Sequence, residues 1–338
     1  MAARMPANGK TQEPEDLSVF QEEFRERKKC KERSSVHSQD CLRCYENEWS
    51  DEKREMCFPK LHEFLSYEND ILPLVFIFIS AFLVLSNTLI ALIFFLFRET
   101  PIVRANNRNL SFTLLVSLTL SSMCVFLFLG RPVNVTCMLR HISFGITFSV
   151  ALSSLLAKTI IVFFAFKATK PDSLWRKCVG TNMSHYEVLI FSSVQVIISV
   201  IWLSTSPPFQ ELDMHSYPGK IIIQCNEGSI FALYSMLSYM GLLATMSFIL
   251  AYMVRTLPDS FNEAKYITFS MLVFCSVWIC AIPAYLSSRG KNMVAVEIFA
   301  ILSSNTAIAS CIFYPKCYII LLKPEENTKR RLLDKPVS

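Results

Sequence analysis

Seven long apolar runs dominate the chain and set its architecture. They cover residues 71–97, 109–130, 138–166, 187–206, 229–254, 265–286 and 293–322. Each is close to the roughly 20 apolar residues that an α-helix needs to cross a bilayer, and the first two runs contain no charged residue. The pattern predicts an all-α membrane protein with a seven-transmembrane helix bundle over residues 71–322.

Prolines mark where these helices end or break. Pro207 and Pro208 follow the fourth run, and Pro171 and Pro258 fall in the connections after the third and fifth runs. Proline in a helix interior removes a backbone hydrogen bond and clashes with the preceding turn. Pro315 therefore predicts an interruption near the end of the seventh helix.

The positions of lysine and arginine predict the orientation, because basic residues near the ends of spans favour the cytosolic side. If the connection that holds Arg98 is cytosolic, thirteen basic residues lie in inner loops and tail. Five are then assigned to outer loops: Arg131, Arg140, Lys220, Arg289 and Lys291. Since the number of spans is odd, the termini lie on opposite sides. We expect a plasma-membrane protein with its N-terminus outside and its tail, residues 323–338, in the cytoplasm.

Composition agrees with this location. The chain is 52% hydrophobic with a mean hydropathy of +0.37, which is too apolar for an ordinary soluble domain. Its net charge is +5, but the basic residues lie in short loops between apolar runs, so the lipid bilayer and not nucleic acid is the expected partner. Residues 1–40 form a charged segment without an assigned fold. No signal-peptide hydrophobic region follows Arg4, so the first run is expected to direct insertion.

Two cysteines are expected at the outer mouth of the bundle. Cys137 opens the third run, and Cys225 lies just before the fifth. An oxidising compartment permits a disulfide between them, which would hold residues 207–229 over the bundle. Two unrelated free thiols are the alternative.

A second group of cysteines precedes the first run. Cys41, Cys44 and Cys57 have the spacing C-x2-C-x12-C, and His62 follows. A zinc site with three cysteines and one histidine is one interpretation, whereas disulfides are more common outside the cell. Three cysteines cannot all pair among themselves, so Cys30 is a candidate fourth partner and the pairing stays open.

Several polar or aromatic residues lie inside the predicted spans. Lys158 and Glu263 fall at the inner ends of the third and sixth helices, where an ion pair would clamp the two helices together; two solvated interfacial charges are the simpler interpretation. Glu297, near the outer end of the seventh helix, either belongs to an outer pocket or is hydrogen-bonded to a neighbouring helix. Trp278 and Tyr285 either line such a pocket or pack the bundle.

Familiar catalytic signatures are absent from the sequence. It contains no phosphate-binding loop, nucleophile elbow or zinc-protease motif, so we expect neither an enzyme nor a cofactor or metal. A transporter or channel would need polar or broken helices at the midplane, whereas the first two spans lack any charge.

Four motifs, in order along the chain, resemble class C G-protein-coupled receptors. Residues 41–57 resemble the end of that family's extracellular cysteine-rich domain, and residues 100–108 (TPIVRANNR) its first inner loop. Residues 261–265 (FNEAK) are similar to its entry into helix six, and residues 313–318 (FYPKCY) to its F-x-P-K-x-Y element in helix seven. The resemblance runs from residue 41 to residue 324.

Within that family the chain is most similar to vomeronasal type-2 receptors. The stretches that carry this similarity are residues 156–159 (LAKT), 257–261 (LPDSF), 271–278 (MLVFCSVW) and 291–298. Calcium-sensing and amino-acid-sensing relatives share some of them.

The resemblance implies roles for individual residues. The family's outer disulfide corresponds to Cys137 and Cys225, its inner ionic lock to Lys158 and Glu263, and its activation-linked tryptophan to Trp278. Its motif positions are Asn262, Lys265, Pro315, Lys316 and Tyr318.

The resemblance also implies a function. The chain is expected to be the transmembrane domain of a pheromone or chemosensory receptor that signals to a heterotrimeric G protein and forms homo- or heterodimers with class C receptors. The family's bilobed extracellular domain has no counterpart here and residues 41–60 are a remnant of its cysteine-rich domain, so a truncated receptor with an unknown ligand is implied. The alternatives are a calcium- or amino-acid-sensing receptor fragment, or a non-signalling dimerisation partner of full-length receptors.

Overall fold

The computed structural model describes residues 28–30, 41–43, 45, 47–50, 57–65, 70–167, 181–214, 219–255 and 263–326. The chain divides into two compact units. Residues 1–63 and 212–222 form the first, and residues 64–211 and 223–338 form the second.

In the described part of the second unit, seven helical segments are long and apolar enough to cross a membrane, which confirms the predicted bundle. Six of them are α2 (Ile71–Leu96), α4 (Arg108–Cys124), α5 (Asn134–Lys167), α6 (Thr181–Thr205), α7 (Ile230–Val254) and α8 (Glu263–Ser287). The seventh is α9 (Lys291–Ile312) followed by α10 (Tyr314–Leu322). Shorter turns are α3 (Pro101–Ala105), η1 (Val125–Leu127) and η3 (Pro324–Glu326).

The helices begin and end close to the predicted positions, with two informative differences. α5 and α6 start several residues earlier than hydropathy indicates, at Asn134 and Thr181, because a helix continues past the apolar core of its span. The seventh span breaks at Phe313, and Pro315 occupies the first turn of α10. Proline is tolerated there because the first-turn N–H groups have no intrahelical partner.

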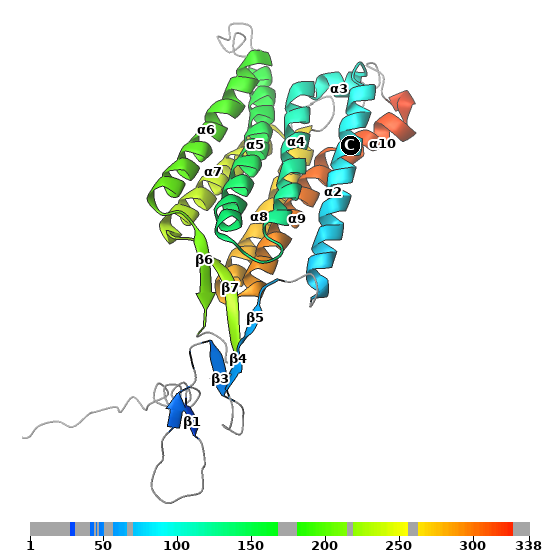
Figure 1. Ribbon diagram of the computed structural model, residues 1–338. Coiled ribbons are helices and arrows are strands. Elements are labelled where there is room, and N and C mark those ends of the chain that lie inside the picture. The colour runs from blue at the N-terminus through cyan, green and yellow to red at the C-terminus, as the bar shows by residue number, and fades with distance from the viewer. Residues whose placement is uncertain are drawn as a thin grey trace, which may run out of the picture. The chain divides into compact units, whose positions relative to one another are not determined.

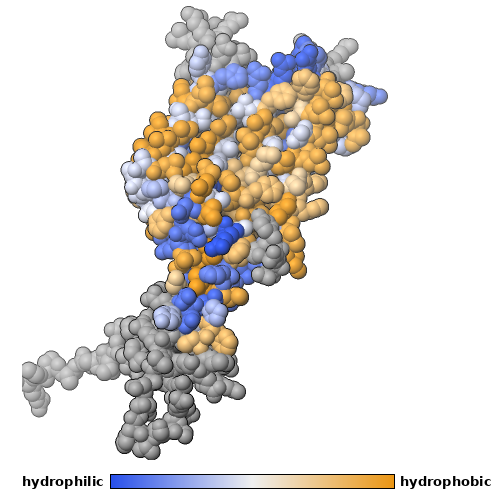
Figure 2. Space-filling view, viewed as in Figure 1, coloured by the Kyte–Doolittle hydropathy of each residue, from blue (hydrophilic) through white to orange (hydrophobic). Residues whose placement is uncertain are grey.

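α5 lies at the centre of the bundle. It packs against α4, α6, α7 and α8, as Figure 1 shows, and 61% of its apolar window is buried, against 28% for α2 and for α6. The buried residues of α2 recur every three or four positions, as one helix face requires: Pro73, Phe76, Ser80, Leu83, Asn87, Ile90 and Phe94. On the face drawn in Figure 2, hydrophobic residues cover most of the middle of the helices, and hydrophilic residues gather at the end that carries α3 and again at the opposite end. Such a surface suits lipid.

Short strands make up the described part of the first unit. β1 (Lys28–Cys30) pairs antiparallel with β2 (Cys41–Arg43), and β3 (Glu48–Ser50) pairs antiparallel with β4 (Cys57–Pro59). β5 (Leu61–Glu63) pairs in parallel with the start of β7 (Lys220–Asn226), and β6 (Phe209–Asp213) is the other neighbour of β7. Hydropathy did not predict these strands, because they are too short to produce an alternating pattern.

Candidate functional sites

A buried group of polar residues joins four segments of the bundle near the start of α8. The Lys158 ammonium of α5 donates to the Glu263 Oε1 atom of α8 at 2.9 Å and to the Ser111 hydroxyl of α4 at 3.0 Å. It also donates to the backbone carbonyl of Asn106 at 2.7 Å and to the Oδ1 atom of that residue at 2.9 Å. The predicted charges are therefore paired and buried, and the interpretation as solvated interfacial charges is wrong.

Lys316 of α10 belongs to the same group. Its ammonium lies 2.6 Å from the Asn106 Oδ1 atom and 3.2 Å from the Glu263 Oε1 atom. One carboxylate oxygen thus faces two ammonium groups, and the side chain of each lysine is less than 5% exposed. We call Lys158, Glu263, Lys316, Asn106 and Ser111 the lysine cluster.

The turn before α4 positions the asparagine of this cluster. Asn107 has φ +48°, in the left-handed region, which asparagine adopts more readily than most residues. This turn leaves both the carbonyl and the side chain of Asn106 facing Lys158. Rearranging any one of α5, α8, α10 or this turn would disturb contacts of the other three.

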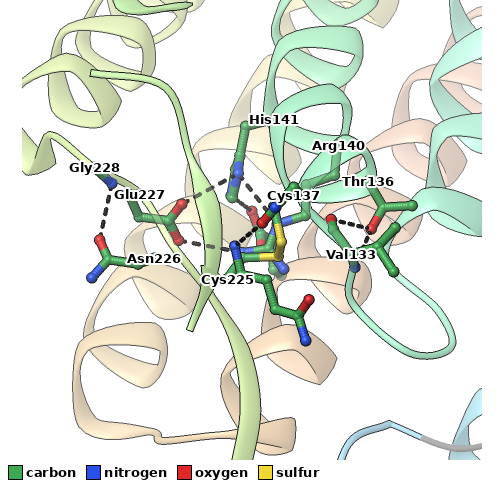
Figure 3. The surroundings of a disulfide bond; sticks show 12 residues. Val133, Thr136, Cys137, Arg140, His141, Cys225, Asn226, Glu227 and Gly228 are labelled. Atoms are coloured by element: carbon green, nitrogen blue, oxygen red, sulfur yellow. Dashed lines mark hydrogen bonds and ion pairs between the residues drawn. A yellow bond between two sulfur atoms is a disulfide. The ribbon is translucent and has the colours of Figure 1, made fainter. Parts of the chain in front are cut away.

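A disulfide closes the opposite end of α5. Cys137, in the first turn of α5, is bonded to Cys225 of β7, as Figure 3 shows. The predicted disulfide is therefore present in the structure. It joins residues 88 positions apart and holds β7 against the end of α5.

Next to the disulfide lies a second buried group of ionisable residues. Arg140 of α5 contacts the Glu227 Oε1 atom at 3.3 Å. His141 lies with its Nε2 atom 2.7 Å from the Glu297 Oε1 atom of α9 and its Nδ1 atom 3.5 Å from the Glu227 Oε2 atom. The Tyr285 hydroxyl of α8 donates to the Glu227 Oε1 atom at 3.4 Å. We call these five residues the histidine cluster; Figure 3 shows three of them beside the disulfide.

Glu227 is anchored through its backbone as well as its side chain. The Trp202 indole N–H of α6 donates to the Glu227 carbonyl at 3.1 Å, and Trp202 is fully buried. The segment after β7 is therefore tied to α5, α6 and α8 within two residues of the disulfide.

Gly228 makes the tight approach of this segment possible. It has φ +66°, and a Cβ atom there would lie 2.6 Å from the Ser206 carbonyl oxygen and 2.9 Å from that of Pro207. We expect Gly228→Ala to lower the thermal stability of the purified protein by several degrees, because both the backbone conformation and the contact become unfavourable. Thermal unfolding in detergent measures this, with Gly241→Ala as the control, since a Cβ atom at Gly241 meets nothing within 4 Å. Equal losses for the two variants would contradict this account.

A cavity of about 50 Å³ adjoins the histidine cluster and has room for a few water molecules. Trp278, Tyr285 and Glu297 all line it, as the pocket interpretation predicts. Trp278 also packs: its indole N–H donates to the Ser304 hydroxyl at 3.1 Å, and its ring stacks on Phe144. Trp278 therefore both lines the cavity and packs against neighbouring helices.

Comparison with known proteins identifies the family. The family model described as "7 transmembrane sweet-taste receptor of 3 GCPR" matches residues 67–316, which include both clusters and the disulfide. The chain belongs to the class C G-protein-coupled receptors.

Individual class C relatives agree. The chain is 51% identical to vomeronasal type-2 receptor 26 of Mus musculus over 86% of its length, which is 34% of that relative. It is 44% identical to mouse vomeronasal type-2 receptor 116, again over 86% of this chain and 34% of the relative. It is 43% identical to the human extracellular calcium-sensing receptor over 86% of this chain and 28% of the relative. The chain thus spans about a third of the length of the relatives it matches.

The class C motif residues have different surroundings. Lys316 lies in the lysine cluster and Pro315 begins α10, whereas Tyr318 is half exposed with the Lys323 ammonium 5.8 Å from the centre of its ring. Lys265 is exposed on α8. Asn262 lies outside the described residues.

The cysteines before the first span do not support a zinc site. Cys57 is disulfide-bonded, so its sulfur is not a thiolate ligand. The register of β1 and β2 places Cys30 opposite Cys41. Cys44 lies outside the described residues, and among the described ones no group of three or more His, Cys, Asp or Glu side chains is arranged so that it could hold a metal ion.

Sequence reasoning missed Asn106, Ser111, Arg140, His141, Glu227 and Trp202 as site residues. Arg140 was assigned to an outer loop, but it lies inside α5 and is 4% exposed. Two adjacent ionisable residues directly before the uncharged part of the third span were the available signal, because charges within a span are rare without a partner.

Proposed function

We propose that this chain is the transmembrane signalling domain of a chemosensory class C receptor of the vomeronasal type-2 kind, and that it activates a heterotrimeric G protein. The observation that supports this proposal best is the lysine cluster. It joins α5, α8 and α10 through one carboxylate and links α4 to them through Lys158, so that a movement of α8 away from it would break several contacts at once.

The cluster favours one arrangement of the helices while Glu263 stays between the two lysines. If the start of α8 moves away, the contacts to α5 and α10 are lost together, and the lysines become accessible to water. A ligand or partner that binds the second arrangement more tightly raises its population. Pro283 lies inside α8, in the part of the helix between Glu263 and Tyr285. It removes one backbone hydrogen bond of this helix and so makes it easier for the start of α8 to move.

The disulfide and the basic residues support the proposed orientation. Disulfides persist in oxidising compartments, so the end with Cys137 and Cys225 faces outside. The lysine cluster, 21 residues after Cys137 along α5 and thus roughly 30 Å away, then faces the cytosol. Arg98, Arg104 and Arg255, which end or follow α2 and α7, lie on that same side, as expected for cytosolic loops. The N-terminus is accordingly outside and the tail inside.

Class C membership also supports pairing with a second receptor of the family, as a homo- or heterodimer.

The proposal is tested by expressing the chain alone and measuring activation of a panel of Gα subunits by energy transfer between labelled Gα and Gβγ. We expect basal activation above that of mock-transfected cells, scaled to the surface level of an epitope-tagged chain. Absence of activation at normal surface levels, together with a reduced signal from a co-expressed full-length vomeronasal type-2 receptor, would contradict the proposal and favour a non-signalling dimerisation partner.

A further inference from the structure

The histidine cluster contains more acid than base. If His141 is neutral, the cluster holds one guanidinium and two carboxylates, and so one negative charge in excess. The side chains are 2% exposed for His141, 4% for Arg140, 10% for Glu227 and 12% for Glu297. An unbalanced charge in such a buried place is unfavourable. One added proton balances it.

The ionisable groups around His141 come from four parts of the bundle. Arg140 on α5, Glu227 after β7, Glu297 on α9 and Tyr285 on α8 are the ionisable groups. The remaining neighbours are the rings of Phe128 and Trp202, 5.8 and 6.1 Å from the imidazole by their centroids. Among the described residues, Arg140 and His141 are the basic side chains that contact these two carboxylates.

We propose that the histidine cluster is a proton-binding site, in which uptake of one proton by His141 strengthens the contacts between α5, α9 and the segment after β7. This proposal goes beyond G-protein signalling and does not depend on it.

The geometry indicates which atom takes the proton. A neutral imidazole carries one N–H. Its Nδ1 atom accepts from the Arg140 Nε atom at 3.3 Å, so the hydrogen of the neutral ring is on Nε2, which faces Glu297. The added proton, taken from a hydronium ion by way of the adjoining cavity, binds Nδ1 in place of the hydrogen bond from the Arg140 Nε atom and releases water. It then faces the Glu227 Oε2 atom, which accepts no hydrogen bond from the described residues.

The sign of the pH effect follows from this arrangement. When His141 carries the added proton, its two N–H groups face one carboxylate each, and a conformation that separates these carboxylates loses both contacts. Acid therefore favours the conformation described here over separated or unfolded ones. Between about pH 8 and pH 5.5, histidine is the ordinary side chain that titrates.

The test is the thermal stability of the purified chain in detergent at several pH values across this range. As pH falls from about 8 to about 5.5, the midpoint of the wild type is expected to rise by a few degrees relative to that of His141→Gln. His185→Gln is the matched control, because His185 lies on α6 and contacts Asn109 instead. This control should keep the pH dependence of the wild type.

Glu297→Gln provides a second, independent variant should His141→Gln fail to fold. It removes the excess carboxylate, so a neutral His141 already balances the cluster and the pH dependence should flatten. Parallel pH curves for the wild type and either cluster variant would overturn the proposal. Flattening in His185→Gln as large as in the cluster variants would overturn it too.

Discussion

Replacing Glu263 with glutamine is expected to raise basal G-protein activation about tenfold or more at equal surface expression. The carboxylate lies 2.9 Å from the Lys158 ammonium and 3.2 Å from that of Lys316, and both lysines are buried. Removing one partner of a buried ion pair typically costs about 3–5 kcal/mol. A conformation in which the lysines reach water avoids much of this cost. A difference of about 1.4 kcal/mol changes the ratio of the two conformations tenfold.

The shared oxygen gives this prediction a distinctive pattern. Lys158→Met leaves Lys316 beside Glu263, and Lys316→Met leaves Lys158 there, so each single variant should activate less than Glu263→Gln. The double variant leaves a buried carboxylate without either cation and should activate more than the sum of the single effects, since residues of one network couple.

Basal activation is measured by energy transfer between labelled G-protein subunits, with surface level recorded for each variant. Ser276→Ala is the control, because Ser276 is exposed on the same helix and its hydroxyl donates to the Leu272 carbonyl of that helix, and we expect no change from it. If Glu263→Gln signals like the wild type at equal surface level, the lysine cluster does not restrain activation.

Hydropathy predicted the seven spans because each depends on a local property, about 20 apolar residues in a row. Helix ends were less accurate, since polar residues such as Asn134 and Thr181 continue a helix beyond the membrane core. The strands of the first unit and β6 and β7 were missed, because their pairing depends on distant segments, as that of Leu61 with Lys220 illustrates.

The lysine cluster could be predicted only in part. Lys158 and Glu263 stand out as charges inside apolar runs, and the resemblance to class C receptors suggested that they pair. The inclusion of Asn106 depends on the left-handed turn at Asn107 and on contacts to Lys158 and Lys316, which are 52 and 210 residues away. No sequence pattern carries that information.

The histidine cluster was missed for a related reason. Hydropathy placed the start of the third span near Arg140, which made this residue look like part of a loop. Glu227 lies between β7 and α7, where carboxylates are usually solvated. The disulfide, by holding Cys225 against Cys137, and the hydrogen bond from Trp202 to the Glu227 carbonyl together bring Glu227 next to Arg140 and His141.

The double variant Cys137→Ser/Cys225→Ser is expected to lose roughly 5–15 °C of thermal stability and much of its surface expression. A disulfide that closes a long loop typically contributes about 2–4 kcal/mol, and each kcal/mol moves the midpoint of a chain of this size by roughly 2–4 °C. The loop here spans 88 positions. Folding should survive, because Trp202 and Arg140 still hold Glu227 through contacts of 3.1 and 3.3 Å.

The contacts of Trp202 and Arg140 with Glu227 predict how the stability lost with the disulfide combines with the stability lost when Glu227 is also replaced. Glu227→Gln removes the charged contact with Arg140, so in the background without the disulfide it should cost more than it does in the wild type. Thermal unfolding and surface labelling of the four chains measure this coupling. Cys280→Ser is the control, since Cys280 is an exposed free cysteine on α8. Equal midpoints for the double variant and this control would show that the disulfide does not hold β7 in place, and the histidine cluster would then owe its geometry to Trp202 and Arg140 alone.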